Sequence, residues 1–219
     1  KTFATLTGIT ELTATDWDGD GRIEVFALSA DERQVGVTTL DEKGRLGFPK
    51  IILTEGRPLS IATGKMMFED KTVLAAITDL DGKRELQIRP ATGEPFRQKL
   101  SDSFKANPTS LITHDVNQDG LQDLIALIPY EKIKILLQVK GADFKEIDVA
   151  PPGGNTDQTW VSLADLDGRR SHEGDAPVAR RTLYAAARAV AIATTVTAAV
   201  RLGLGGDAGG RIGAGREPG

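Results

Sequence analysis

The chain has 219 residues, of which 40% are hydrophobic, a formal net charge of −4, and no Cys. This length and apolar content suffice for a buried core, in one domain or in a row of small repeated units. The lack of Cys excludes disulfides and thiol chemistry but does not indicate a compartment. The acidic balance argues against nucleic-acid binding, which needs a basic face.

The first predicted element is a loosely alternating strand at residues 9–15, which leads into an acidic loop at residues 16–24 and a strand at residues 23–29. Carboxylates stand at positions one, three, five and nine of the loop, and Gly21 stands at position six. Ca²⁺ takes roughly six to eight oxygen ligands, which alternate side chains and one backbone carbonyl of a flexible loop can supply. The alternative is a polar turn rich in Asp and Gly. We favour the ion, because position nine is acidic as well, and the expected ligands are Asp16, Asp18, Asp20, Glu24 and the carbonyl of Arg22.

Two further strands, at residues 34–40 and 48–53, complete a first unit, and a second unit opens with a strand at residues 58–63. Its loop position, residues 64–71, has Met66, Met67 and Phe68 where Asp is expected, so no ion is predicted there. Strands follow at residues 72–78, 84–89 and 96–100. Asp79 and Asp81 resemble a shortened calcium loop, but they lie where a hairpin turn belongs, and we interpret them as turn residues.

The third unit repeats the acidic pattern. A strand at residues 109–113 precedes the loop 115–123, and strands at residues 123–129, 132–139 and 144–149 follow. The expected ligands are Asp115, Asn117, Asp119, Asp123 and the carbonyl of Leu121. A fourth unit begins with a strand at residues 159–164, and Asp165 and Asp167 start a third acidic loop that is interrupted at residue 169.

Two independent features of the sequence recur with nearly the same spacing along the chain. Phe48, Phe96 and Phe144 each follow the last turn of a unit at intervals of 48 residues, and the loop positions begin at residues 16, 64, 115 and 165. Four short strands in about fifty residues are typical of a propeller blade. The units span approximately residues 9–56, 57–106 and 107–156, with a partial unit at 157–168.

Acidic Asp-x-Asp/Asn-x-Asp-Gly-x-x-Asp/Glu loops that run into a strand, with Gly and Phe before the last strand, resemble FG-GAP/VCBS-type repeats. The resemblance covers roughly residues 9–168 and implies an all-β fold, a β-propeller whose blades hold Ca²⁺ between their first two strands. Such repeats are similar to those of integrin α-subunits and of many secreted bacterial proteins, which implies an extracellular or periplasmic protein. A closed propeller has about four to eight blades, so further blades are expected beyond these units.

Residues 169–219 differ in composition: Arg, Ala and Gly predominate and no Lys occurs. We hypothesise that the reading frame slips near residue 168, and we expect this tail to be partly helical or disordered. Its longest apolar run is too short to span a bilayer, which needs about 20 residues.

Catalysis has little support in the sequence. The two His are isolated, and His114 is expected to be a solvated strand-end residue. Trp17 and Trp160 are expected to pack between blades, with a sugar platform as the alternative. We therefore expect a non-enzymatic, calcium-stabilised scaffold or recognition module for protein or carbohydrate. The alternatives are an accessory or catalytic domain of a polysaccharide-active enzyme and a cell-adhesion surface.

Overall fold

The described part of the chain consists of twelve β-strands in three sheets. The computed structural model describes residues 3–67 and 71–149. The strands are β1 (Ile9–Thr15), β2 (Glu24–Ser29), β3 (Gln34–Thr39), β4 (Lys50–Ile52), β5 (Arg57–Lys65), β6 (Thr72–Leu80), β7 (Lys83–Pro90), β8 (Phe96–Lys99), β9 (Ser110–His114), β10 (Asp123–Ile128), β11 (Lys132–Leu137) and β12 (Lys145–Val149). This part of the chain contains no helix, so none in it could span a membrane.

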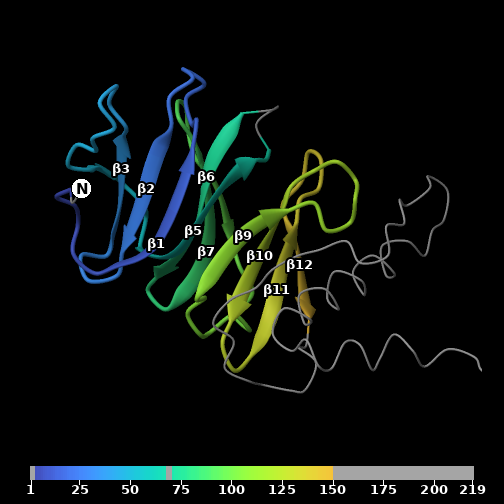
Figure 1. The fold of residues 1–219 in the computed structure, drawn as a ribbon. Helices are drawn as coiled ribbons and strands as arrows, with labels where there is room; N and C mark the ends of the chain where they lie inside the picture. The colour runs from blue at the N-terminus through green and yellow to red at the C-terminus, as the bar shows by residue number, and fades with distance from the viewer. Residues whose placement is uncertain (1–2, 68–70, 150–219) are drawn as a thin grey trace, which may run out of the picture.

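Each sheet is an antiparallel meander of four strands that follow one another in the sequence. We call them sheet 1 (β1–β4), sheet 2 (β5–β8) and sheet 3 (β9–β12), and Figure 1 shows them side by side. This confirms the predicted all-β class and the four-stranded unit. The strand ends differ from the predicted ones by at most two residues. At β5 the difference shortens the expected loop, because the strand continues to Lys65, two residues beyond its predicted end.

The predicted hairpin turn of sheet 2 is confirmed for Asp81, whereas Asp79 is not in the turn but in β6, where it pairs with Arg84. Asp81 and Gly82 have φ of 53° and 80°, the left-handed conformations that a two-residue hairpin turn requires. The N–H of Gly82 donates to Asp79 Oδ1 at 2.8 Å. Asp79 also pairs with Arg57 at 3.3 Å and with Arg84 at 3.0 Å. Its carboxylate is therefore satisfied by cations of the chain.

Apolar side chains fill both junctions between sheets. Phe26 and Leu28 of sheet 1 pack with Ile61 and Leu74 of sheet 2. The alternate residues of β6 face the other way and join β10 in the larger cluster between sheets 2 and 3. Strand β6 is therefore apolar on both faces, which is what a central sheet buried on two sides requires. A third cluster, formed by β10, β11 and Val116, covers the face of sheet 3 turned away from sheet 2.

The first strands of the three sheets, β1, β5 and β9, lie next to one another. The hydroxyls of Thr13 and Thr63 are 2.7 Å apart, and the hydroxyl of Thr113 donates to the carbonyl of Thr63 at 3.2 Å. Glu11 accepts hydrogen bonds from the Ser60 hydroxyl at 2.5 Å and the Ile61 N–H at 2.6 Å, beside a register shift in β5. Polar contacts along these three strands therefore fix how each sheet meets the next.

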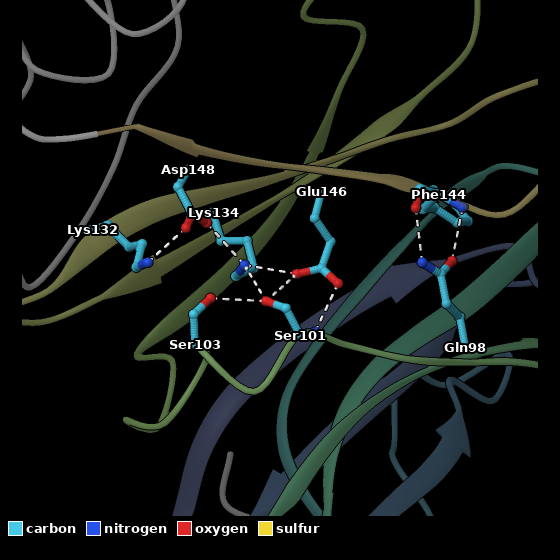
Figure 2. A network of polar contacts seen from close by, with 8 residues as sticks. All are labelled: Gln98, Ser101, Ser103, Lys132, Lys134, Phe144, Glu146 and Asp148. Carbon is cyan, nitrogen blue, oxygen red and sulfur yellow. Dashed lines mark hydrogen bonds and ion pairs between the residues drawn. The ribbon is translucent and has the colours of Figure 1, made fainter.

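A buried lysine of β11 joins sheet 3 to the segment that follows β8 of sheet 2 (Figure 2). Lys134 is 1% exposed and pairs with Glu146 at 2.7 Å and Asp148 at 2.8 Å. Glu146 also accepts from the N–H and the hydroxyl of Ser101, which follows β8, both at 2.8 Å. Nearby, the amide group of Gln98 pairs with both backbone polar groups of Phe144 at 2.7 Å. The junction between sheets 2 and 3 thus has apolar side chains at its centre and, along this margin, polar side chains that are paired with one another or with the backbone.

Candidate metal centres in two acidic loops

The loop between β1 and β2 is closed by its own carboxylates. Asp16 accepts the N–H of Gly19 at 2.9 Å and that of Gly21 at 3.1 Å with separate oxygens. Asp20 Oδ1 accepts the N–H of Arg22 at 2.8 Å. Glu24 Oε2 accepts the N–H of Trp17 at 2.8 Å and so closes the loop at its start. The acidic positions of the sequence pattern therefore give this loop its shape.

The loop between β9 and β10 has the same bonding pattern 99 residues later. Asp115 Oδ2 accepts the N–H of Gly120 at 2.8 Å, Asp119 Oδ1 accepts that of Leu121 at 2.8 Å, and Asp123 Oδ2 accepts that of Val116 at 2.9 Å. Position three contributes in both loops, since Asp18 and Asn117 each accept an N–H at 3.2 Å from the residue at position five. The two loops therefore have closely similar conformations and differ at one bond, since Asp16 Oδ1 accepts the N–H of position four and Asp115 Oδ1 that of position five.

Backbone geometry supports this equivalence. Position four has φ of 79° at Gly19 and 59° at Gln118, and position six has φ of 83° at Gly21 and 86° at Gly120. Left-handed conformations strain residues that have a Cβ. A non-glycine residue at position four shows that the loop conformation, and not the residue type alone, imposes this geometry.

The first loop brings three carboxylates together. Asp16, Asp18 and Glu24 each place an oxygen within 4.8 Å of the others. Glu24 is buried, Asp16 is half-buried and Asp18 is exposed. Carboxylates at this separation repel one another, and a divalent cation between them would remove the repulsion. Asp20 lies at the exposed side of the same loop, where it holds the N–H of Arg22.

Asp123, the closing carboxylate of the second loop, is fully buried. Burial raises the pKa of Asp123 to about 6, although the N–H groups of Val116 and Gln138 lower it; the charges of Asp119 and Asp115 raise it further. A bound cation favours the ionised form of a carboxylate. A cation beside Asp123 would therefore stabilise its ionised form.

The donor set fits a hard divalent cation. Every predicted side-chain ligand presents oxygen, from carboxylates and one amide, and no described His or Cys lies among them. Oxygen ligands from a flexible loop are what Ca²⁺ prefers, whereas Zn²⁺ favours nitrogen and sulfur. The carbonyls of Arg22 and Leu121 stay predicted ligands.

The corresponding position of sheet 2 has an apolar residue in place of a ligand. Met66 is 3% exposed and belongs to the cluster between sheets 2 and 3. Met67, with φ of 60°, packs against the same cluster. In this unit the loop position thus carries methionines that contribute to the core in place of acidic ligands.

Of the remaining sequence predictions, those for His114 and Trp17 concern described residues and the others do not. His114 is exposed at the end of β9, as expected. Trp17 packs edge-on against Phe26 at a centroid distance of 5.3 Å, and its indole N–H donates to the Arg89 carbonyl of sheet 2 at 3.3 Å, which confirms packing between sheets. Asp165, Asp167, Trp160 and the tail lie outside the described residues.

Gln122 within the second loop and Gln138 beside it were not identified from the sequence. Gln122 precedes the closing Asp123, and its Oε1 accepts the N–H of Lys65 in sheet 2 at 2.8 Å. Gln138 donates its own N–H to Asp123 Oδ1 at 2.8 Å, and its side chain accepts the N–H of Met67 at 3.2 Å. No local pattern marks such residues, because their partners lie far away in the sequence.

Comparison with known proteins identifies one repeat. A family model described as an FG-GAP-like repeat matches residues 115–169, a span that begins at the first acidic residue of the second loop and includes β10, β11 and β12. No curated protein matches the chain.

Proposed function

Starting from the FG-GAP-like repeat that this chain carries, we propose that the protein is a calcium-binding β-repeat scaffold whose two acidic loops each hold one Ca²⁺ ion. The observation that carries this proposal is the shared conformation of loops 16–24 and 115–123. The same oxygen-bearing positions and the same left-handed residues occur in both, in two different sheets. These oxygens also accept hydrogen bonds of the turn, but in the first loop Asp16, Asp18 and Glu24 also bring three carboxylate oxygens within 4.8 Å of one another, which favours an ion over a merely polar turn.

The stacked sheets are interpreted as consecutive blades of a β-propeller. Two observations support this: the first strands of the three sheets lie side by side, and apolar clusters fill each junction. In such an arrangement an ion in each acidic loop would fix the connection between the first two strands of a blade. The blade faces and connecting loops would then form a surface for a protein or carbohydrate ligand, without catalysis. FG-GAP repeats are typical of extracellular proteins, which agrees with an extracellular or periplasmic location.

Thermal unfolding with added Ca²⁺, added Mg²⁺ or a chelator tests the ion sites. An ion that binds only the folded chain at one hundred times its Kd stabilises it by about 2.7 kcal/mol. For a protein of this size this corresponds to a rise in Tm of roughly 5 to 10 °C for each ion, and to about twice that for both. We expect the rise with Ca²⁺ and a much smaller one with Mg²⁺, which prefers a rigid octahedral site.

Variants of the loop residues test whether the calcium-dependent rise in Tm comes from ions bound in the two loops. Asp20→Ala and Asp119→Ala also remove turn hydrogen bonds, so the informative quantity is the calcium-dependent increment in Tm and not the Tm itself. Each single variant should lose about half of the increment and the double variant nearly all of it. Asp81→Asn, in the left-handed hairpin turn of sheet 2, is the matched control and should keep the full increment. A cooperative transition that calcium does not shift would reduce both loops to acidic turns.

A further inference from the structure

The second acidic loop reaches beyond its own sheet. Gln122 lies inside the loop, and its side-chain oxygen accepts the N–H of Lys65 at the end of β5. A Cβ added to Gly64 would stand 2.4 Å from that oxygen. Glycine at residue 64 therefore leaves the space through which the loop of sheet 3 contacts the backbone of sheet 2.

Gln138 makes a second connection. Its backbone N–H donates to Asp123 Oδ1, and its side-chain oxygen accepts the N–H of Met67. Gln138 is 8% exposed, and its hydrogen bond to Asp123 is buried, whereas the one from Met67 is partly buried. One residue thus contacts a predicted ion ligand with its backbone and the neighbouring sheet with its side chain.

The two connections end on the last residue of β5, Lys65, and on the described start of the following loop, which lacks ligands. Met66 and Met67 follow β5 as the acidic loops follow β1 and β9 in sheets 1 and 3. In loop 16–24 the backbone N–H groups are held by the carboxylates of the loop itself. In sheet 2 the N–H groups of Lys65 and Met67 are held instead by Gln122 and Gln138 of the next sheet.

We propose that Ca²⁺ bound in loop 115–123 also orders residues 64–67 of sheet 2, through Gln122 and Gln138, so that one ion fixes two consecutive sheets. This inference rests on the proposed function of the loop as an ion site. Ion binding fixes Asp123 and the loop backbone, and thereby the two glutamines that hold Lys65 and Met67. Coupling of this kind requires that the ion favour the conformation in which the distant contact is made.

Amide hydrogen exchange of the full chain tests the coupling, with Ca²⁺ alone as the ligand and a chelator as the reference. The N–H of Gly120, inside the ion loop, reports ion binding in the same sample in which Lys65 and Met67 report the coupling. We expect Ca²⁺ to slow exchange at all three. At Lys65 and Met67 the slowing should be at least about fivefold, the lower end of typical allosteric coupling.

Variants separate the connection from general stabilisation. Gln138→Met removes the side-chain acceptor but keeps the backbone N–H that contacts Asp123, so calcium should still protect Gly120 and no longer protect Met67. Gln98→Met is the matched control, because Gln98 also joins sheets 2 and 3 but contacts only the Phe144 backbone. This control should keep the calcium-dependent protection of Met67.

A second pair of variants tests the coupling even if Gln138→Met does not fold. Asp119→Ala should abolish calcium-dependent protection at Lys65 and Met67, whereas Asp20→Ala, in the loop of sheet 1, should leave it unchanged. Protection of Gly120 without protection of Lys65 and Met67 overturns the coupling and leaves the ion site standing. No calcium-dependent protection at Gly120 overturns the ion site and the coupling together.

Discussion

The substitution Lys134→Met tests whether the buried lysine holds sheets 2 and 3 together. The change keeps a long unbranched side chain but removes the charge. It breaks the ion pairs to Glu146 and Asp148, the hydrogen bond to Ser101 Oγ at 3.2 Å, and the stacking of the ammonium over Phe104 at 5.7 Å from the ring centre. Two carboxylates then remain without their shared cation (Figure 2).

The expected loss of stability follows from the exposure of those carboxylates. Removing one partner of a fully buried ion pair costs about 3 to 5 kcal/mol. Here Glu146 and Asp148 are 20% and 41% exposed, and water offsets part of the cost. Asp148 also keeps Lys132 at 2.6 Å, and Glu146 keeps both hydrogen bonds from Ser101. We therefore expect a loss of about 2 to 3 kcal/mol.

Urea unfolding followed by circular dichroism measures this loss. With an m-value of about 2 kcal/mol/M, the midpoint of Lys134→Met should fall by about 1 M. Lys132→Met is the matched control: Lys132 shares the strand and the Asp148 partner but is 24% exposed, so it should cost less than about 1 kcal/mol. Equal losses in the two variants would refute the argument from burial.

The pH dependence provides a second check on the same variant. Partial burial raises the pKa of Asp148, but hydrogen bonds from Lys132 and Lys134 outweigh this effect and hold the pKa below its usual value. A carboxyl with a lowered folded-state pKa stabilises the fold above its unfolded pKa of about 3.9 and loses this contribution as the pH falls through the folded pKa. The stability gap between the wild type and Lys134→Met should therefore be full at neutral pH and narrow below about pH 4.

Two further predictions concern the contacts between neighbouring sheets. Gly64→Ala places a Cβ 2.4 Å from Gln122 Oε1 and 3.0 Å from Thr113 Cγ2. Gln122 must then release the N–H of Lys65, and urea unfolding should show a loss of about 1 to 2 kcal/mol in the free energy of unfolding. Gly47→Ala, whose Cβ would meet no described atom closer than 3.8 Å, should cost less than about 1 kcal/mol, and an equal loss in both would contradict the predicted clash. Burial raises the pKa of Glu11, although hydrogen bonds from Ser60 and Ile61 lower it, so the fold is penalised as the pH rises above the unfolded value of about 4.3. The side chain of Glu11→Gln can donate to the Ser60 hydroxyl and still accept from the Ile61 N–H. We therefore expect this variant to have a higher Tm than the wild type at pH 7 and the same Tm below pH 4. A lower Tm at pH 7 would show that the charge of Glu11 is itself needed.

The strands and the two acidic loops could be predicted because their signals are local. A strand is specified by alternation over a few residues, and the loops by oxygen-bearing side chains within nine residues of one another. The hairpin at Asp81 and Gly82 was predictable for the same reason, since the repeat register placed these residues between two strands. The ligand-free loop of sheet 2 followed from its methionines.

Contacts between sheets could not be predicted in this way. Phe48 and Phe144 occupy matching positions in the repeat, yet Phe48 is 64% exposed and Phe144 is 3% exposed. Phe144 belongs to the apolar cluster between sheets 2 and 3, and its ring lies at a centroid distance of 6.3 Å from that of Phe96. The repeat pattern thus predicts where a side chain lies within its own sheet and not whether another sheet covers it.

The sequence by itself determined the all-β class, the four-stranded unit and the two acidic loops, because each depends on residues that are close together along the chain. Only the tertiary structure decided that Lys134 is buried while Lys132, two residues away on the same strand, is partly exposed. It also decided that Gln122 and Gln138 connect the second loop to sheet 2. The physical reason is that burial and long-range hydrogen bonds depend on which surfaces meet when the sheets pack, and residues 57 and 71 positions apart carry no mutual signal in the sequence.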